Sequence, residues 1–469
     1  MTKMKKWFKC GWILVIILLS GFFSSCDKDS NDKPDTTVSD SFESGNIGDI
    51  TRVSDTEWNL YIANDNDNAV LPEAWRSWWY VKMDNLVMNT PTELVIKNSG
   101  WPYYYLPVYT YDQQEWFQFS ENEVTQNDDN EIIVRKQFAQ ETVWIARFYP
   151  YTLTDLENYI KYIRNSPYVN IQIPGYSQEG QPIYAFRITD SNVPVSGKKR
   201  VFMHARTHPA ETPSSFLVEG IINFLISGTQ EASGILSKFE FYIFPMQNVD
   251  GVIAGNYRAT PKSENLEVMW YYDSGNPLNL TGEAPPEVKI VHQYAKNLMN
   301  DGGPSISIAL NLHASNSEPD IRPFFYPHFG AATQGYSPVE SSLWEKQIRF
   351  INCVASNYGY DMIEPITEPG GSSFASKTYP ESWWWVNFKD QVMAMTLEMT
   401  YGRAGYSPEW VKPDDLRDLG KSLTLGIRDY CDDSFSPNQS MLRSGRNIKK
   451  MNLKYPELYP PYAVDEQKE

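Results

Sequence analysis

A change in hydrophobic period near residue 150 constrains the fold of this chain more than any other feature. Before that point, apolar and polar residues alternate in short runs, among them Trp58–Ile62, Trp79–Met83 and Val143–Ala146, with turn-forming Asn and Asp residues between them. Such runs are typical of strands with one buried face. The pattern therefore predicts an antiparallel β-sandwich over residues 41–149.

After Pro150, runs of strand length alternate with longer stretches of helical period. The predicted strands are 200–205, 240–244, 306–312 and 392–397, and the predicted helices are 154–163, 213–226, 286–299, 342–355 and 413–431. This alternation predicts an α/β domain over residues 150–432, built around a mixed, largely parallel sheet. Residues 433–469 lose the periodicity and are interpreted as an irregular tail.

The first 25 residues have the features of a secretory signal. A lysine-bearing start precedes the apolar run Gly11–Phe23, which is too short for a membrane span. Two serines then precede Cys26, and this arrangement resembles the lipobox of bacterial lipoproteins, in which the cysteine is acylated and becomes the mature N-terminus. Residues 26–40 are polar and charged, which favours a flexible tether. We therefore expect an extracytoplasmic protein, lipid-anchored in the bacterial cell envelope at the outer membrane or cell surface.

The formal net charge of −17 makes negatively charged binding partners unfavourable. An acidic surface disfavours nucleic acid and anionic membrane faces, so membrane contact is expected only through the lipid anchor at Cys26. Cys353 and Cys431 remain for the mature chain in an oxidising compartment, and both fall in predicted helices. The sequence leaves open whether they form a disulfide or stay separate thiols, and it does not set the oligomeric state.

The segment Arg206–Ser215 carries the first candidate metal ligands. It follows an apolar run and contains His208 and Glu211, with Pro213 at a predicted helix start and Thr212 as its cap. A strand that turns into a helix here would direct both side chains to one point, and zinc accepts nitrogen and oxygen ligands together. The spacing alone is weak evidence, because it arises by chance, but the chain has only five histidines.

Three further residues complete a candidate hydrolytic centre. His313 follows the predicted strand 306–312 and would supply a third ligand, which leaves a fourth position for water. Glu398 ends another predicted strand, where a carboxylate beside a zinc-activated water can act as general base. Arg258 follows a strand and a predicted Asp-Gly turn, and a fixed guanidinium there could stabilise an oxyanion.

Four segments, in this order, resemble the zinc metallocarboxypeptidases. They are His208-Pro-Ala-Glu211, Asn248-Val-Asp-Gly-Val with Gly255-Asn-Tyr-Arg258, the strand ending in His313, and the strand ending in Glu398. The cytosolic-carboxypeptidase-like branch, which has a β-sandwich ahead of its α/β/α catalytic domain, is the most similar. The resemblance covers roughly residues 41–430. It implies one Zn²⁺ bound by the two histidines and Glu211, with Glu398 as general base and then acid, and Arg258 polarising the substrate carbonyl.

One segment departs from the pattern of that branch. There, a Leu-Asn-Arg-x-Trp sequence holds the substrate's free C-terminal carboxylate through its Asn-Arg pair, whereas this chain has Leu266-Glu-Val-Met-Trp270. A carboxylate at 267 would repel the substrate carboxylate, and the bidentate arginine is missing. We therefore predict a metallocarboxypeptidase-like peptidase of atypical specificity, with Arg258 and Glu267 contacting the substrate.

Two alternatives stay open at this point. The first is a zinc amidase, deacylase or cell-wall-peptide hydrolase, whose substrate offers an amine or amide to Glu267. The second is a lipoprotein that keeps the fold but only binds peptides or glycans.

Overall fold

The computed structural model describes residues 35–315, 319–358, 370–403 and 409–436. The predicted signal, Cys26, the tether up to residue 34 and the tail from residue 437 lie outside the described residues. Within them, residues 37–39 at the end of the predicted tether form strand β1 (Thr37–Ser39), which pairs with β4 (Tyr80–Asp84). No helix in the described ranges combines the length and the apolar character that crossing a membrane requires.

The N-terminal domain consists of two five-stranded sheets, as the alternating pattern predicts. One sheet has the order β1, β4, β10 (Val143–Ala146), β6 (Val108–Thr110) and β7 (Phe117–Gln118). The other has the order β2 (Ile50–Arg52), β3 (Glu57–Tyr61), β5 (Pro91–Lys97), β9 (Ile132–Gln137) and β8 (Val124–Gln126). Neighbouring strands are antiparallel except for the parallel pair β3 and β5. In β3, Trp58 and Leu60 are buried and their neighbours are half-buried, so the period of two produces one core face.

The α/β domain is built on a seven-stranded mixed sheet. Its order is β11 (Val169–Tyr176), β12 (Pro182–Ile188), β14 (Phe239–Phe244), β13 (Lys199–Ala205), β17 (Ile306–Ser315), β19 (Met393–Thr400) and β18 (Phe324–Tyr326). The four central strands, β14, β13, β17 and β19, run parallel to one another. The strand at each end of that group pairs with an antiparallel neighbour. The predicted mixed, largely parallel sheet is therefore confirmed.

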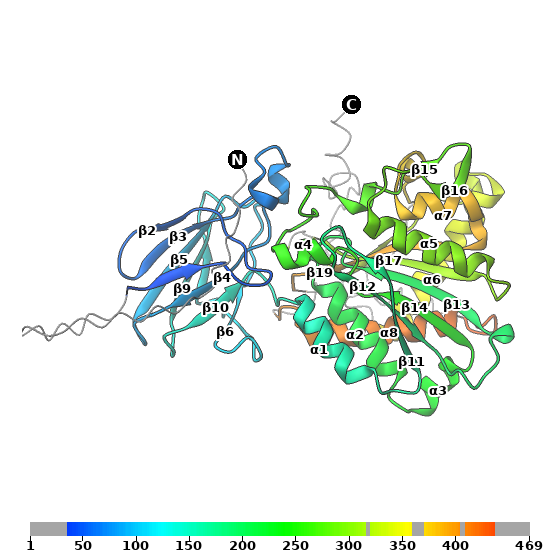
Figure 1. Ribbon diagram of the computed structural model, residues 1–469, viewed down its shortest axis with the longest axis horizontal. Helices are drawn as coiled ribbons and strands as arrows, with labels where there is room; N and C mark the ends of the chain where they lie inside the picture. The colour runs from blue at the N-terminus through cyan, green and yellow to red at the C-terminus, as the bar shows by residue number, and fades with distance from the viewer. Residues whose placement is uncertain (1–34, 316–318, 359–369, 404–408, 437–469) are drawn as a thin grey trace, which may run out of the picture. The chain divides into compact units, whose positions relative to one another are not determined.

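Helices cover both faces of this sheet (Figure 1), with α2 and α8 on one face and α5 and α7 on the other. The helix α8 also packs along α6. The longer helices are α1 (Leu153–Ile163), α2 (Pro213–Leu225), α5 (Pro286–Asn300), α6 (Pro338–Tyr358), α7 (Pro380–Phe388) and α8 (Pro413–Tyr430). Two shorter helices are α3 (Gln230–Leu236) and α4 (Val249–Ala254), and β15 (Tyr272–Asp273) pairs with β16 (Asn276–Leu280) in a small hairpin.

Helix starts follow local capping chemistry in some places and not in others. Thr152 caps α1 by accepting a hydrogen bond from the Asp155 backbone N–H, and the Asp155 side chain accepts one in return. Thr212 was predicted to cap α2, but its side chain forms no capping hydrogen bond. Its backbone is already helical, and a capping side chain needs an extended backbone to reach the first-turn N–H groups.

The predicted Asp-Gly turn before Arg258 is wrong, because the structure has helix α4 there. The Asn248 side chain accepts a hydrogen bond from the Gly251 N–H at the start of this helix. Gly255 ends it with a φ of 74°, in the left-handed region that glycine adopts without strain. These two residues together form the start and stop signals of a short helix.

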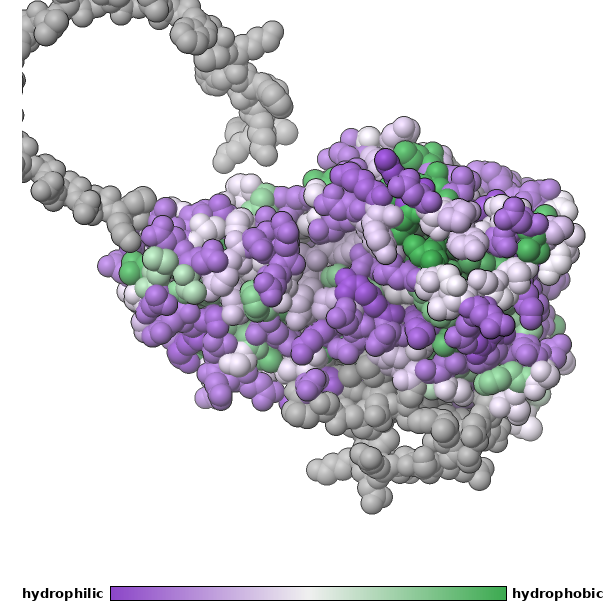
Figure 2. Space-filling model, turned by 90° about the horizontal axis from the view of Figure 1, so that it is seen from below, coloured by the Kyte–Doolittle hydropathy of each residue, from purple (hydrophilic) through white to green (hydrophobic). Residues whose placement is uncertain are grey.

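Strands β17 and β19 extend beyond the predicted ends, so that His313 and Glu398 lie within them. Cys353 is a buried free thiol and Cys431 a half-buried one, so these two cysteines do not pair in the described structure. The face of the molecule in Figure 2 is mostly hydrophilic, with apolar side chains in several groups, the most extended of them at the upper right.

Candidate metal centre

The candidate ligands lie at the carboxyl edge of the parallel strands, at the position where the order in which strands are added to the sheet reverses. From β13 the chain first adds β14 on one side and later returns to add β17 on the other side. A crevice forms at such a reversal, and ligands of α/β sheets bind there. His208 and Glu211 follow β13 in the loop to α2, and His313 lies on β17.

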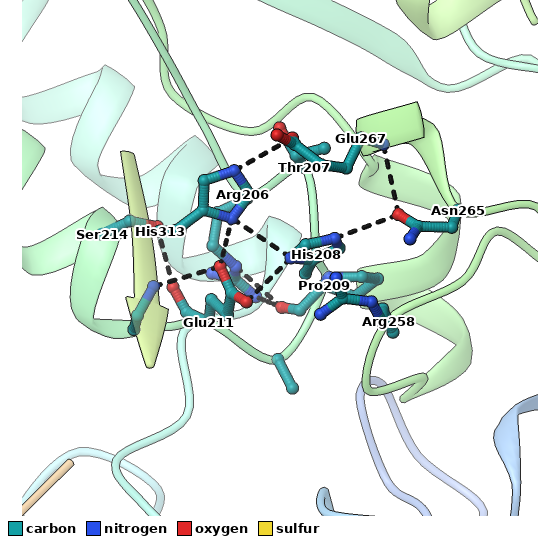
Figure 3. Close-up of polar contacts among 12 residues, drawn as sticks. Arg206, Thr207, His208, Pro209, Glu211, Ser214, Arg258, Asn265, Glu267 and His313 are labelled. Atoms are coloured by element: carbon teal, nitrogen blue, oxygen red, sulfur yellow. Dashed lines mark hydrogen bonds and ion pairs between the residues drawn. The ribbon is translucent and has the colours of Figure 1, made fainter. Parts of the chain in front are cut away.

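The side chains of His208, Glu211 and His313 point toward one another (Figure 3). One oxygen of Glu211 lies 2.8 Å from His208 Nδ1, and the other lies 2.7 Å from His313 Nδ1. The two Nδ1 atoms are 3.1 Å apart. All three side chains are buried. The structure thus brings together the three residues that the sequence analysis selected as ligands.

This donor set fits a zinc ion. Ligand atoms of the three residues all lie within 4.8 Å of one another. Two imidazole nitrogens and a carboxylate direct lone pairs at one buried point, an arrangement that a bound cation relieves. Burial opposes ionisation of Glu211, but its close contacts with the His208 and His313 rings outweigh this effect and lower its pKa. Three protein ligands are the number that catalytic zinc sites use.

A buried arginine shapes the loop that holds His208. Arg206 has a φ of 57°, which is uncommon for a residue with a side chain. Its guanidinium donates to the carbonyl oxygen of Pro209 at 2.7 Å, to that of Tyr151 at 2.9 Å and to Ser215 Oγ at 2.8 Å. One side chain therefore ties the loop to the start of α2 and to the segment before α1. Nothing in the sequence pattern indicated this role for Arg206, although it begins the segment Arg206–Ser215.

The outer nitrogens of the two histidines have different partners. His208 Nε2 lies 3.0 Å from Asn265 Oδ1, and His313 Nε2 lies 3.1 Å from Glu267 Oε2. Asn311, on β17, donates from Nδ2 to both oxygens of Glu267, at 3.0 and 3.1 Å. The structure thus places Glu267 against a candidate ligand. Asn265 was missed, and its position two residues before Glu267 was the only signal for it.

Glu398 lies beside His313, because β19 pairs with β17 in the register that sets these two residues opposite each other. Its side chain is buried. Burial raises the pKa of Glu398, while the charges of His313 and Arg258 act in the opposite direction. A carboxylate with a raised pKa can hold a proton between two steps of a reaction.

Arg258 is buried, with its guanidinium carbon 5.7 Å from the centre of the Trp75 ring. The backbone around it is held by Asp65 of the N-terminal domain. Asp65 accepts hydrogen bonds from the N–H groups of Tyr257 at 2.6 Å, Arg258 at 2.8 Å and Ala259 at 2.7 Å. Burial raises the pKa of Asp65 to about 6 despite these three donors. In the sequence, Asp65 lies among turn-forming Asn and Asp residues and gave no sign of this contact.

Two parts of the chain match known protein families. Residues 38–148 match the family described as cytosolic carboxypeptidase N-terminal domain, and residues 156–282 match the family described as zinc carboxypeptidase. The second match contains His208, Glu211 and Arg258 and ends before β17 and β19 begin.

Individual relatives agree with these matches. Human cytosolic carboxypeptidase 2 is 28% identical over 256 residues, which are 48% of this chain and 28% of that protein. Cytosolic carboxypeptidase 6 of Caenorhabditis elegans is 27% identical over 327 residues, which are 65% of this chain and 67% of that protein. The chain thus spans less than a third of the length of the human relative.

Solved structures share the fold. A putative carboxypeptidase A from Shewanella denitrificans OS-217 aligns with a TM-score of 0.68 at 22% identity, over 84% of this chain and 98% of that one. A metallo-carboxypeptidase from Pseudomonas aeruginosa, in complex with (2-guanidinoethylmercapto)succinic acid, aligns with a TM-score of 0.67 at 21% identity, over 83% of this chain and 98% of that one. Both alignments cover more of the chain than the α/β domain alone.

Proposed function

We propose that this chain, whose residues 38–148 match the cytosolic carboxypeptidase N-terminal domain family and whose residues 156–282 match the zinc carboxypeptidase family, hydrolyses amide bonds of peptides or related substrates. The observation that carries this proposal is the convergence of His208, Glu211 and His313, with Glu398 opposite His313 on the next strand. These residues supply a metal site and a general base, and Arg258 adds a buried cation.

Each side chain has one role in the proposed reaction. A zinc ion held by His208, Glu211 and His313 would supply Lewis acidity to the attacking water and to the scissile carbonyl. Glu398 takes the proton of the attacking water and returns it to the leaving amine. Arg258 stabilises the negative charge that develops on the carbonyl oxygen.

The proposed specificity differs from that of an ordinary carboxypeptidase. At the positions where the family resemblance implies an Asn-Arg pair for the substrate carboxylate, this chain has Glu267 and Val268. Val268 packs against an apolar cluster that includes Phe329 and Phe374, and Glu267 adds negative charge. A buried negative charge and an apolar side chain at these two positions disfavour a free carboxylate. The proposal therefore includes a zinc amidase, deacylase or cell-wall-peptide hydrolase.

Metal analysis and hydrolysis of matched peptides test this proposal. We expect the purified protein to hold one zinc per chain and to cleave an amide bond in a panel of peptides, each offered as the free acid and as the C-terminal amide. We expect the amide forms to be cleaved with the higher kcat/KM. Zinc binding without turnover of any substrate would favour the alternative of a peptide- or glycan-binding protein, and a preference for free acids would contradict the proposed specificity.

We also propose that the protein is a lipoprotein of the bacterial cell envelope, on the evidence of the signal sequence and the serines before Cys26. Mass spectrometry of the mature protein from its native host should find an acylated cysteine at position 26 as the N-terminal residue. In Cys26→Ser the acyl group should be absent, and the protein should leave the membrane fraction. An unmodified N-terminus at another residue would contradict this prediction.

A further inference from the structure

Glu267 lies on a short 3₁₀ turn, Leu266–Val268, that brings its carboxylate to the outer side of His313. Its side chain is about 1% exposed. One of its oxygens lies 3.1 Å from His313 Nε2, and Asn311 Nδ2 donates to both oxygens. Figure 3 shows the carboxylate at the His313 ring, on the side away from Glu211. Its hydrogen-bonding capacity is therefore directed at β17 and not at a substrate.

The orientation of the His313 ring determines which of its two nitrogens carries the proton. Nδ1 faces Glu211 and His208, so it is the nitrogen that a metal ion would take. A neutral imidazole carries only one N–H, and a ring that offers Nδ1 as a lone pair must carry its proton on Nε2. Glu267 is the acceptor for that proton.

The two candidate histidine ligands are held in different ways. Both direct Nδ1 to the centre, but the outer nitrogen of His208 faces a neutral amide oxygen of Asn265, whereas that of His313 faces a carboxylate. A carboxylate behind a ligating imidazole fixes its tautomer and ring orientation and increases its basicity. The negative charge also favours a bound cation.

We propose that Glu267 is a positioning residue of the metal centre, which accepts the outer N–H of His313 and thereby strengthens zinc binding. This inference rests on the proposed zinc site at His208, Glu211 and His313. It accounts for a carboxylate at a position where the family resemblance implies a neutral amide that contacts substrate. The two hydrogen bonds from Asn311 Nδ2 compensate for the cost of burying the negative charge of Glu267.

Zinc affinity of the full chain, measured by competition with a chromophoric chelator, tests the proposal. Removal of such a partner typically lowers metal affinity about 10- to 100-fold, and we expect this loss in Glu267→Ala. Glu267→Gln should lose less, because its side-chain carbonyl can still accept the N–H although the charge is gone. Far-UV circular dichroism and thermal unfolding of the metal-free proteins check that each variant is folded.

Glu381→Gln is the matched control. Glu381 is a second buried carboxylate, whose pKa is raised first by burial and then by Glu267, and it accepts a hydrogen bond from Thr396 Oγ1 at 2.7 Å. Its substitution removes a nearby acid without removing the contact to His313. We expect zinc affinity close to that of the wild type.

The outcomes separate this inference from the proposed function. Wild-type zinc affinity in Glu267→Ala, with zinc-dependent hydrolysis retained, would overturn the inference alone. An equal loss in Glu381→Gln would also overturn it, because the loss would then not depend on the contact with His313. A wild-type chain that binds no zinc would overturn the proposed function together with the inference. If Glu267→Ala does not fold, Glu267→Gln must still bind zinc more weakly than Glu381→Gln.

Discussion

The residues of this centre include the candidate ligands and the side chains that hold those ligands from behind. His208 and His313 turn Nδ1 inward and are held from behind by Asn265 and Glu267. Glu398 belongs to neither group, because it reaches the centre from the neighbouring strand at the same level as His313. A substitution at Glu398 can therefore change the chemistry while the ligands stay in place.

We expect Glu398→Gln to keep its zinc and to lose activity. Glutamine has nearly the same shape but cannot accept a proton at neutral pH, so kcat should fall by about 10²- to 10⁴-fold. Glu219→Gln is a suitable control, because Glu219 is another buried carboxylate but bonds to Tyr151 and Arg417, away from the centre. Steady-state kinetics and metal analysis of both variants check the prediction. Loss of zinc from Glu398→Gln would instead make Glu398 part of the metal site.

The sequence predicted the residues that face the centre better than the residues that form hydrogen bonds to the outer nitrogens of the histidines. His208, Glu211, His313 and Glu398 each follow or end an apolar run, and that pattern indicated where their side chains would meet. The partners of the outer nitrogens come from a short 3₁₀ turn and its N-terminal cap, Asn265, a stretch that has no hydrophobic period. A hydrogen bond between two polar side chains distant in sequence leaves no periodic signal, so Asn265 could not be identified as a partner of His208.

At the level of elements, the loop between β13 and α2 is held by Arg206 and not by Thr212, the predicted cap of α2. Thr212 forms no capping hydrogen bond, and the loop is held by the donors of Arg206 to Pro209, Tyr151 and Ser215. Planar guanidinium groups can serve three acceptors in different directions, which an ammonium group cannot do with the same geometry. The sequence pattern correctly predicted where α2 starts. It attributed the stabilisation of that start to Thr212, whereas Arg206 provides it.

We therefore expect Arg206→Lys to lower the free energy of unfolding by about 1 to 3 kcal/mol, because at least one buried carbonyl oxygen loses its donor. Zinc affinity should fall as well, since His208 lies in the same loop. Arg135→Lys provides the comparison, because the Arg135 side chain is 54% exposed and pairs with Glu93. Exposed pairs of this kind contribute little to stability. Equal unfolding free energies for the two variants in urea denaturation would contradict the role given to Arg206.

At the scale of the whole molecule, one segment of the N-terminal domain supports the backbone around Arg258. Residues 44–68 form hydrogen bonds with residues 252–263, including Ser44 Oγ to the Val252 carbonyl at 2.7 Å and Asn66 Nδ2 to the Thr260 carbonyl at 2.9 Å. Asp65 forms three more, to the backbone around Arg258. The division into a β-sandwich and an α/β domain followed from hydrophobic period. These contacts, however, join residues about 190 to 210 positions apart, and no local sequence pattern indicated them.

We predict that this support makes the proposed reaction depend on a residue of the sandwich. In Asp65→Asn the amide has one acceptor oxygen, and its NH₂ group faces backbone N–H donors, so the three hydrogen bonds cannot all persist. Arg258 should then lose its fixed position. A small displacement of a catalytic group is costly, and we expect kcat to fall by about 10- to 100-fold with zinc content unchanged. Assays at pH 8, well above the Asp65 pKa of about 6, ensure that the wild-type carboxylate is ionised and accepts all three bonds.

Asp67→Asn is the matched control, because Asp67 belongs to the same short 3₁₀ turn and its side chain is exposed. If the sandwich acted only as a separate module, the two variants would have the same kcat. A decrease confined to Asp65→Asn, at equal zinc content and equal KM, would show that the sandwich holds Arg258 for the reaction and not for substrate binding. A decrease accompanied by loss of zinc would instead show that the segment around Arg258 also supports His208, through the hydrogen bond from the Ala210 N–H to the Tyr257 carbonyl at 3.1 Å.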